Sequence, residues 1–156
     1  MDGLEFKRIG LDEIDLLVKS RIDYCMRDNP SCTKEEYDLF NKSVEDWTRE
    51  NAKSGNYIGY IGCIDNEIVS FAGLLMYVLP PLLKNSNRKQ GHVLSFFTYP
   101  KYRSKGIGNE MMKFMIADAK TLNISQLVLS ATPMGEPLYK KNGFTEPKMK
   151  YMTLDV

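Results

Sequence analysis

The residues that follow the strand-like stretch His92–Tyr99 constrain the fold of this chain most. Residues 100–109 read PKYRSKGIGN, and the apolar spacing of a helix begins at once, at Ile107. A glycine-rich turn between a strand and a helix directs several backbone N–H groups to one point at the positive end of the helix, where proteins commonly bind phosphate. The apolar stretch Gln126–Ala131 comes after the helix, so we expect a right-handed crossover between two parallel strands.

Two features of this turn favour a phosphate ligand. Gly106 and Gly108 allow a tight backbone turn and a close approach to a ligand. Arg103 and Lys105 add positive charge at the same place. The spacing differs from the two common phosphate loops, G-x-x-x-x-G-K-[ST] and G-x-G-x-x-G. A structural glycine turn with a solvated basic face is the alternative.

The turn resembles the cofactor-binding motif of the GNAT superfamily, the acyl-CoA-dependent N-acetyltransferases. That motif reads [Arg/Gln]-x-x-Gly-x-[Gly/Ala], and Arg103, Gly106 and Gly108 match its defined positions. One helix and one strand downstream, Leu138–Phe144 reads LYKKNGF, which is similar to the L-Y-x-x-x-G-F signature of the same family. The resemblance extends from about Tyr57 to the C-terminus.

This resemblance implies that the chain uses acetyl-CoA as a co-substrate and needs no metal. In the family, the backbone of the turn holds the pyrophosphate of CoA. The preceding strand splays away from its parallel neighbour, the pantetheine arm fills the gap, and a backbone N–H faces the thioester oxygen as an oxyanion donor. The cofactor-binding residues expected on this basis are Phe96, Phe97, Thr98, Arg103, Ser104, Lys105, Gly106, Ile107, Gly108, Asn109 and Thr132. We expect the rings of Phe96 and Phe97 to form core or pocket wall.

Tyr139 is the expected catalytic residue. The family places a tyrosine at this point of the second motif, with its hydroxyl near the CoA sulfur, and a phenol can protonate a departing thiolate. A tyrosine packed for its ring alone is the alternative. Seven residues earlier, many members carry an asparagine that bonds the cofactor arm; this chain has Thr132, from which we expect a weaker contact.

The general base is not evident from the sequence. The single histidine, His92, can take up a proton near neutral pH, although a lone histidine is more often an ordinary surface residue. In the family, the first two helices and a loop that corresponds to Leu79–Gln90 shape the acceptor pocket. The acidic residues of the second predicted helix, which either attract an amine or form a solvated face, are Glu36, Asp38, Glu45 and Asp46. Because of them we do not expect a strongly polyanionic acceptor.

Hydrophobic spacing predicts the element order β-α-α-β-β-β-α-β-α-β, a mixed α/β (α+β) sheet flanked by helices as in the GNAT fold. The expected strands are Leu4–Ile9, Tyr57–Ile64, Ile68–Val78, His92–Tyr99, Gln126–Ala131 and Lys148–Leu154. Local signals support this order: a helix break at Asn29-Pro30-Ser31, a capping box at Thr33–Glu36, a hairpin turn at Asp65-Asn66 and a left-handed helix C-cap at Gly143.

Length and composition favour a single domain over residues 1–156, since the chain is 43% hydrophobic and long enough for one core. The net charge of +1 creates no field that favours nucleic acid or a membrane surface. The start Met1–Glu5 lacks the pattern of a signal peptide, so we expect a cytoplasmic protein. Three irregularly spaced cysteines and one histidine argue against disulfides and against a metal site.

We therefore expect an N-acetyltransferase that moves acetyl from acetyl-CoA to a primary amine of a small molecule or peptide by direct attack. A non-catalytic acyl-CoA-binding regulatory module of the same fold is the first alternative. A nucleic-acid binder is the second, and it would use Lys84, Arg88, Lys89, Lys101, Arg103 and Lys105. The near-neutral charge and the lack of aromatics within the basic loop count against it. Nucleic acid and membrane are not expected partners, a homodimer is left open, and the acceptor is not identified.

Overall fold

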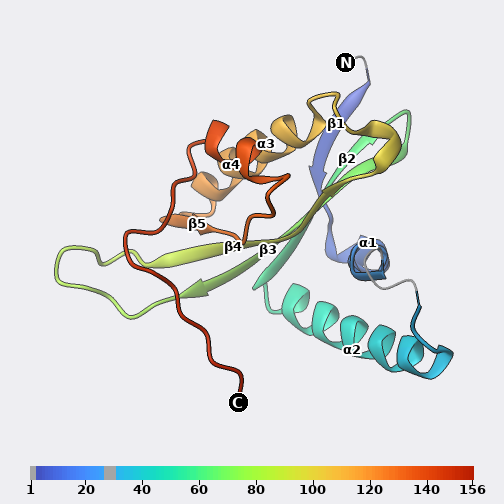
Figure 1. The fold of residues 1–156 in the computed structure, drawn as a ribbon, viewed down its shortest axis with the longest axis horizontal. Helices are drawn as coiled ribbons and strands as arrows, with labels where there is room; N and C mark the ends of the chain where they lie inside the picture. Colours follow the sequence, from blue (N-terminus) through green and yellow to red (C-terminus); the bar gives the residue numbers. More distant parts are fainter. Residues whose placement is uncertain (1–2, 27–30) are drawn as a thin grey trace.

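A five-stranded sheet separates two layers of helices in the computed structural model, which describes residues 3–26 and 31–156 (Figure 1). The strands are β1 (Leu4–Arg8), β2 (Tyr57–Ile64), β3 (Glu67–Val78), β4 (Lys89–Thr98) and β5 (Gln126–Val128), and they lie in this order across the sheet. Strands β1 to β4 pair antiparallel, whereas β5 pairs with β4 in parallel. The predicted mixed sheet and its parallel crossover are confirmed.

Helices cover both faces of the sheet. Helices α1 (Ile14–Met26) and α2 (Lys34–Lys53) lie on one face, and α3 (Ile107–Thr121) and the short α4 (Glu136–Lys141) lie on the other (Figure 1). Within the described residues, no helix has the length and apolarity needed to cross a bilayer. The predicted break at Asn29-Pro30-Ser31 falls largely on residues 27–30, which lie outside the described residues.

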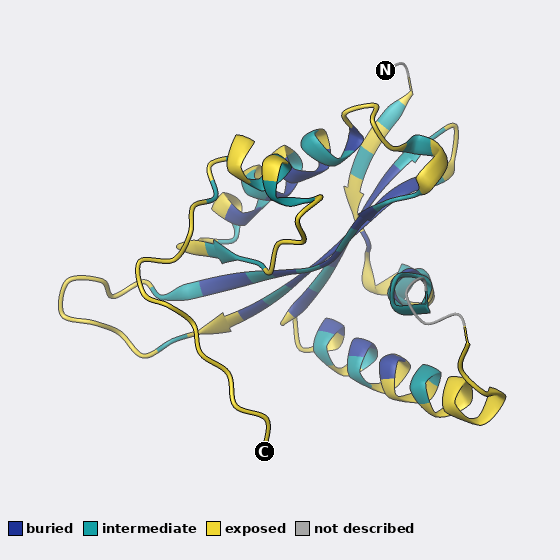
Figure 2. Ribbon diagram, viewed as in Figure 1, coloured by how far each residue is buried: buried dark blue, intermediate teal, exposed yellow. Residues whose placement is uncertain are grey.

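Each face of the sheet has its own hydrophobic cluster. The cluster under α3 and α4 contains Tyr60, Ala72, Leu74, Met76, Val93, Met111, Met112 and Met115. The cluster under α1 and α2 contains Ile9, Leu17, Ala52, Tyr57, Ile61, Phe71 and Phe97. Figure 2 shows the buried stripe along the central strands, while the tip of the β3–β4 hairpin and the C-terminal segment are exposed. Residues from β2, β3 and β4 belong to both clusters, so these three central strands link the two faces.

The predicted local signals are confirmed where they fall on described residues. The hydroxyl of Thr33 accepts from the backbone N–H of Glu36, and the Glu36 carboxylate accepts from the N–H of Thr33, which is the capping box of α2. Asp65 and Asn66 both have positive φ angles, 49° and 64°, as a tight hairpin turn requires. Gly143 has φ 89° after α4, and Phe144 N–H bonds back to the carbonyl of Tyr139.

One predicted element is wrong: Lys148–Leu154 forms no strand. Its apolar side chains are exposed, with Met149 at 83% and Tyr151 at 77% relative accessibility. Alternating hydrophobicity stabilises a strand only when a neighbouring strand satisfies its backbone N–H and C=O groups. The sheet ends at β5, which has three residues and offers a short edge. The strand predicted over Gln126–Ala131 correspondingly ends early, at Val128.

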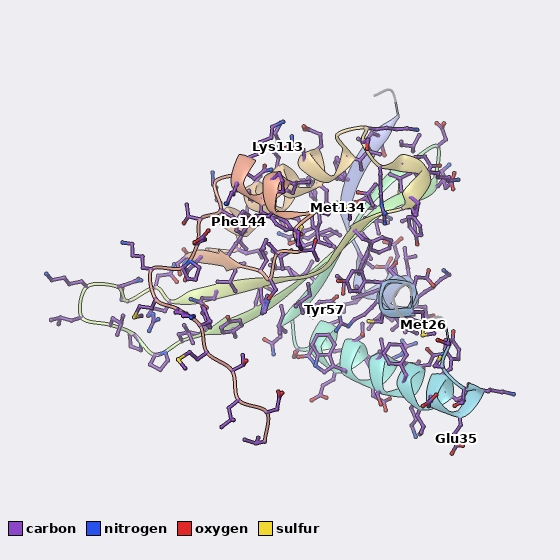
Figure 3. The ribbon with its side chains drawn as sticks, viewed as in Figure 1. Met26, Glu35, Tyr57, Lys113, Met134 and Phe144 are labelled. Carbon is purple, nitrogen blue, oxygen red and sulfur yellow. The ribbon has the colours of Figure 1, made fainter. Side chains whose placement is uncertain are left out.

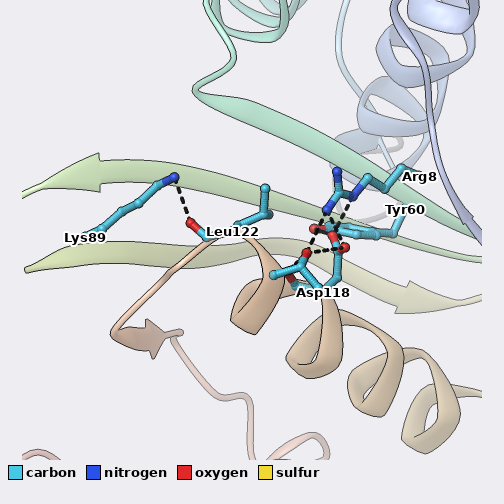
Figure 4. A network of polar contacts seen from close by, with 6 residues as sticks. Arg8, Tyr60, Lys89, Asp118 and Leu122 are labelled. Atoms are coloured by element: carbon cyan, nitrogen blue, oxygen red, sulfur yellow. Dashed lines mark hydrogen bonds and ion pairs between the residues drawn. The ribbon is translucent and has the colours of Figure 1, made fainter. Parts of the chain in front are cut away.

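Polar contacts fix α3 and the residue after it against β1, β2 and β4 (Figure 4). Tyr60 donates its hydroxyl to Asp118 Oδ2 at 2.7 Å, and Arg8 donates Nε to the same oxygen at 2.6 Å. Lys89 Nζ donates to the carbonyl of Leu122 at 3.1 Å, just past the end of the helix. These bonds hold the C-terminal half of α3, and thereby help to position its N-terminus at the end of β4.

Candidate functional site

A cavity of about 1240 Å³ opens where β4 and β5 separate. The two strands pair only from Gln90 opposite Gln126 to His92 opposite Val128. Strand β4 continues to Thr98 after β5 has ended, so its outer edge beyond His92 lacks a strand partner. On its other edge, β4 stays bonded to β3 as far as Thr98 opposite Ser70. The gap is therefore an opening in a firmly held sheet.

The cavity brings together nearly all of the predicted site residues. Those that line it are Phe96, Phe97, Thr98, Arg103, Ser104, Gly106, Ile107, Gly108, Asn109, Thr132 and Tyr139. Lys105 does not line it; its ammonium lies 5.4 Å from the centre of the Tyr102 ring instead. The residues cluster because β4, the turn after it and α4 meet at the opening. The roles predicted for them stay predictions.

The glycine turn has the geometry of an anion site. Ser104 and Gly106 have positive φ angles of 59° and 80°, and Gly106 caps the start of α3. Asn109 and Glu110 donate their N–H groups to the Gly106 carbonyl, whereas no acceptor in the described chain takes the N–H of Ile107 or Gly108. The first N–H groups of a helix have no intrahelical partner, so these two are available to a ligand.

Two side chains brace this turn. Arg103 donates Nε to the carbonyl of Thr98 at 3.0 Å, which ties the turn to the end of β4. Asn109 accepts from Asn142 Nδ2 at 3.0 Å, which links the start of α3 to the end of α4. Arg103 also lines the cavity, where its guanidinium adds positive charge beside the backbone donors.

Strand β4 carries a bulge in the middle of the cavity wall. Its register against β3 shifts between Phe71 and Gly73, and Ser95 has φ 53°, a left-handed conformation that is uncommon for residues other than glycine. After the bulge, Phe96 packs towards α4 and Phe97 packs into the core under α1 and α2. Both phenylalanines line the cavity, and Phe97 also belongs to the hydrophobic core under α1 and α2.

Tyr139 lies on α4 with its ring between two phenylalanines. Its ring centre is 5.9 Å from that of Phe96 and 5.9 Å from that of Phe144, both edge to face. Burial raises the pKa of the Tyr139 hydroxyl, and the neighbouring phenol of Tyr24 adds to the shift. Among the side-chain hydrogen bonds of the described residues, none uses the Tyr139 hydroxyl. A protonated phenol therefore lines the cavity with its donor available.

Thr132 has a local structural role besides its place in the cavity. Its hydroxyl accepts from the N–H of Gly135 at 3.2 Å, and its carbonyl accepts from the N–H groups of Gly135 and Glu136 at 2.9 Å. These bonds form the turn that starts α4. Met134, labelled in Figure 3, lies in the same turn and lines the cavity. The O–H of Thr132 therefore remains available to donate a hydrogen bond to a ligand.

The cavity is also lined from α1 and from β4. Tyr24, His92 and Ser95 line it, and His92 is half-buried. No Asp or Glu of the described residues lines the cavity. The acidic side chains of α2 that were expected to border the acceptor lie outside it, as Figure 3 shows for neighbouring Glu35 at the far end of α2. Neither α2 nor the loop Leu79–Gln90 contributes a residue to the lining of the cavity.

Tyr24 and Ser95 were missed from the sequence. Ser95 takes its position from a bulge that depends on pairing with β3, and the chain carries no glycine there to signal a positive φ. Tyr24 belongs to a helix whose apolar spacing does not distinguish a residue of the core from one that lines a cavity. Neither residue lies in a motif.

Comparison with known proteins gives one family and one fold. A family model described as an acetyltransferase (GNAT) domain matches residues 28–151. A predicted acetyltransferase with acetyl-CoA from Clostridium acetobutylicum superposes with a TM-score of 0.80 at 22% identity, over 97% of this chain and 96% of that one. A GCN5-related N-acetyltransferase from Ralstonia eutropha JMP134 gives 0.76 at 24%, over 97% and 99%.

A more distant structure is an aminoglycoside acetyltransferase from an uncultured soil metagenomic sample, in complex with sisomicin. Its TM-score is 0.65 at 10% identity, over 99% of this chain and 95% of that one. At these identities the likenesses establish the fold alone. No curated protein sequence matches the chain.

Proposed function

The chain belongs to the GNAT acetyltransferases, and we propose that it moves acetyl from acetyl-CoA to the primary amine of a small molecule or peptide by direct attack. One observation carries this proposal: a single cavity joins a set of free backbone N–H groups at a helix start, an unpaired strand edge and a half-buried phenol. These three parts correspond to the phosphate, the arm and the sulfur of a CoA thioester.

The residues fit such a co-substrate. The N–H groups of Ile107 and Gly108, with Arg103 beside them, offer donors to the pyrophosphate. A Cβ placed on Gly106 would meet no atom within 4 Å, so the space before the helix start is open to a ligand. The amide-rich pantetheine arm can pair with the outer edge of β4 beyond His92, as an added strand pairs with a sheet edge.

The proposed reaction needs three tasks from the protein. The amine nitrogen attacks the thioester carbon, and a backbone N–H near the bulge of β4 stabilises the negative charge that develops on the carbonyl oxygen. The carbon–sulfur bond then breaks, and Tyr139 donates its proton to the departing thiolate. His92 lines the cavity and is the candidate acceptor of the amine proton, directly or through water.

Replacement of Gly106 by valine tests the phosphate site. The φ of 80° disfavours a β-branched residue, and its side chain would occupy the ligand space before α3. We expect Gly106→Val to abolish acetyl-CoA binding in calorimetry at about 1 mM ligand while the protein stays folded. Gly55→Val is a matched control, because Gly55 has φ 76° and open space around it but lies outside the cavity.

The two glycine variants should lose similar stability, and only Gly106→Val should lose the ligand. Equal affinity in both variants would remove the turn from the site, and wild-type protein that binds neither acetyl-CoA nor CoA would refute the proposal. A non-catalytic CoA-binding module is the alternative, and it predicts binding without thiol release for any amine. Release of free CoA thiol in the presence of an acceptor separates the two.

A further inference from the structure

Beside the part of the cavity that Tyr24 and Ser95 line, there is a positive charge that has no acidic partner among the described residues. Arg21 on α1 donates Nη1 to the hydroxyl of Ser95 at 2.6 Å, and Ser95 lines the cavity. Arg21 is half-buried between α1, α2 and the sheet. No Asp or Glu of residues 3–26 and 31–156 forms an ion pair with it. A partly desolvated guanidinium without an anion is a binding opportunity.

The surroundings of Arg21 hold it in place without neutralising it. Its guanidinium carbon lies 5.0 Å from the centre of the Trp47 ring and 6.0 Å from that of Tyr57, which are cation–π distances. Burial raises the pKa of Tyr57 to about 12, so this phenol stays neutral beside the cation. Asp23, two residues along the helix, is engaged by Lys19.

The lining of the cavity adds a second observation. It contains no Asp or Glu among the described residues, and it includes Tyr24, His92 and Ser95. An acceptor with several ammonium groups, such as an aminoglycoside or a polyamine, would meet no carboxylate there. Arg21 is not itself a lining residue; it lies behind Ser95 and is only half-buried, so one negative group of an acceptor would have to reach past Ser95 to meet it.

We propose that the acceptor is an amine that also carries a carboxylate, and that Arg21 binds this carboxylate at the edge of the cavity beside Ser95 and Tyr24. The inference rests on the proposed acetyl transfer. A guanidinium has five N–H donors in a planar fork, so donors remain beside the bond to Ser95, and two parallel donors suit a carboxylate. One guanidinium also balances the single charge of a carboxylate, whereas a phosphate monoester carries up to two.

Matched acceptors test the class. Release of CoA thiol is measured with each common L-amino acid and its amide, and with glucosamine, glucosamine 6-phosphate, spermidine and kanamycin. We expect kcat/KM for the preferred amino acid to exceed that of its amide by roughly 10- to 150-fold, the worth of one charge-assisted hydrogen bond. Turnover confined to the phosphate, the polyamine or the aminoglycoside, equal rates for acid and amide, or no turnover of any acid would overturn the inference. Calorimetric acetyl-CoA binding tests the proposed function separately.

Variants of Arg21 then assign the contact. In Arg21→Gln the KM for the amino acid should rise by roughly 10- to 150-fold towards that of the amide, with the KM for acetyl-CoA unchanged. Arg21→Lys keeps the charge without the fork and should fall between the two, and it remains informative if the glutamine variant folds poorly. Arg49→Gln is the control, because Arg49 lies on α2 and pairs with Asp15 and Glu45. An equal loss for acid and amide in both Arg21 variants would mean that Arg21 only braces Ser95, and would refute the carboxylate contact.

Discussion

Replacement of Tyr139 by phenylalanine isolates one oxygen atom in the cavity. The ring makes edge contacts with Phe96 and Phe144, both at 5.9 Å between centres, and phenylalanine keeps these contacts. The hydroxyl enters no hydrogen bond among the described side chains, so its removal leaves no partner unsatisfied. The free energy of unfolding should therefore change by less than about 0.5 kcal/mol, as at sites where no interaction is lost.

The effect on rate should be much larger. Burial raises the pKa of the Tyr139 hydroxyl, so the group carries its proton throughout the neutral range in which the enzyme would be assayed. General acid catalysis contributes roughly 10²–10⁴-fold, which corresponds to about 3–5 kcal/mol of transition-state stabilisation. We expect kcat of Tyr139→Phe to fall within that range, while the Kd for acetyl-CoA changes little, because the proton is transferred in the transition state.

The assay pairs kinetics with binding. Thiol release gives kcat, and calorimetry gives the Kd for acetyl-CoA on the same preparations. Tyr77→Phe serves as the control, since Tyr77 lies on β3 outside the cavity and is partly exposed; it should leave both values unchanged. An unchanged kcat in Tyr139→Phe would show that the thiolate leaves unaided or takes its proton from water. A large loss of affinity at normal kcat would make Tyr139 a binding residue.

Two further predictions concern stability. Burial alone would raise the pKa of Asp118, but the bonds from Arg8 and Tyr60 outweigh it and hold that pKa below its ordinary value. A lowered pKa stabilises the fold above the pKa of the unfolded state and loses this contribution as pH falls through the folded value. Asp118→Asn should therefore cost about 2 kcal/mol at pH 7 in denaturant unfolding, with a difference from wild type that narrows below about pH 4; a constant difference would refute this. Thr33→Ala removes the side-chain half of the capping box with Glu36 and should cost about 1 kcal/mol, and unchanged unfolding would show that α2 is held by its packing alone.

The elements that could be predicted are those fixed by local chemistry. The hairpin at Asp65-Asn66 and the cap at Thr33 each follow from residues a few positions apart, and both appear in the structure. The glycine turn is of the same kind. The prediction of a strand over Lys148–Leu154 was wrong, because alternating hydrophobicity does not indicate whether the sheet has a free edge with which the segment can pair. Ser95 could not be foreseen, since its left-handed conformation is imposed by pairing across the sheet.

Both the proposed acid and the proposed acceptor contact depend on the position of β4. Because the side chains of a strand alternate between faces, Phe96 packs towards α4 and its tyrosine, while Phe97 packs towards α1 and α2. The bulge at Ser95 adds one residue to β4 there, so Ser95 reaches Arg21 without moving Phe96 from the other face. A shift of β4 by one residue would exchange these faces and separate the proposed acid from the proposed acceptor contact.

The register of β4 is therefore a functional requirement as well as a structural one. It is fixed by the pairing with β3 alone in the region where β5 has ended. There Ser70 donates its hydroxyl to the carbonyl of Phe97 at 2.9 Å, and Tyr99 donates its N–H to the carbonyl of Val69 at 3.0 Å. Ser70 is fully buried, so this bond is shielded from water. The antiparallel pair β3–β4 thus supplies the rigidity that lets the other edge of β4 stay open to a ligand.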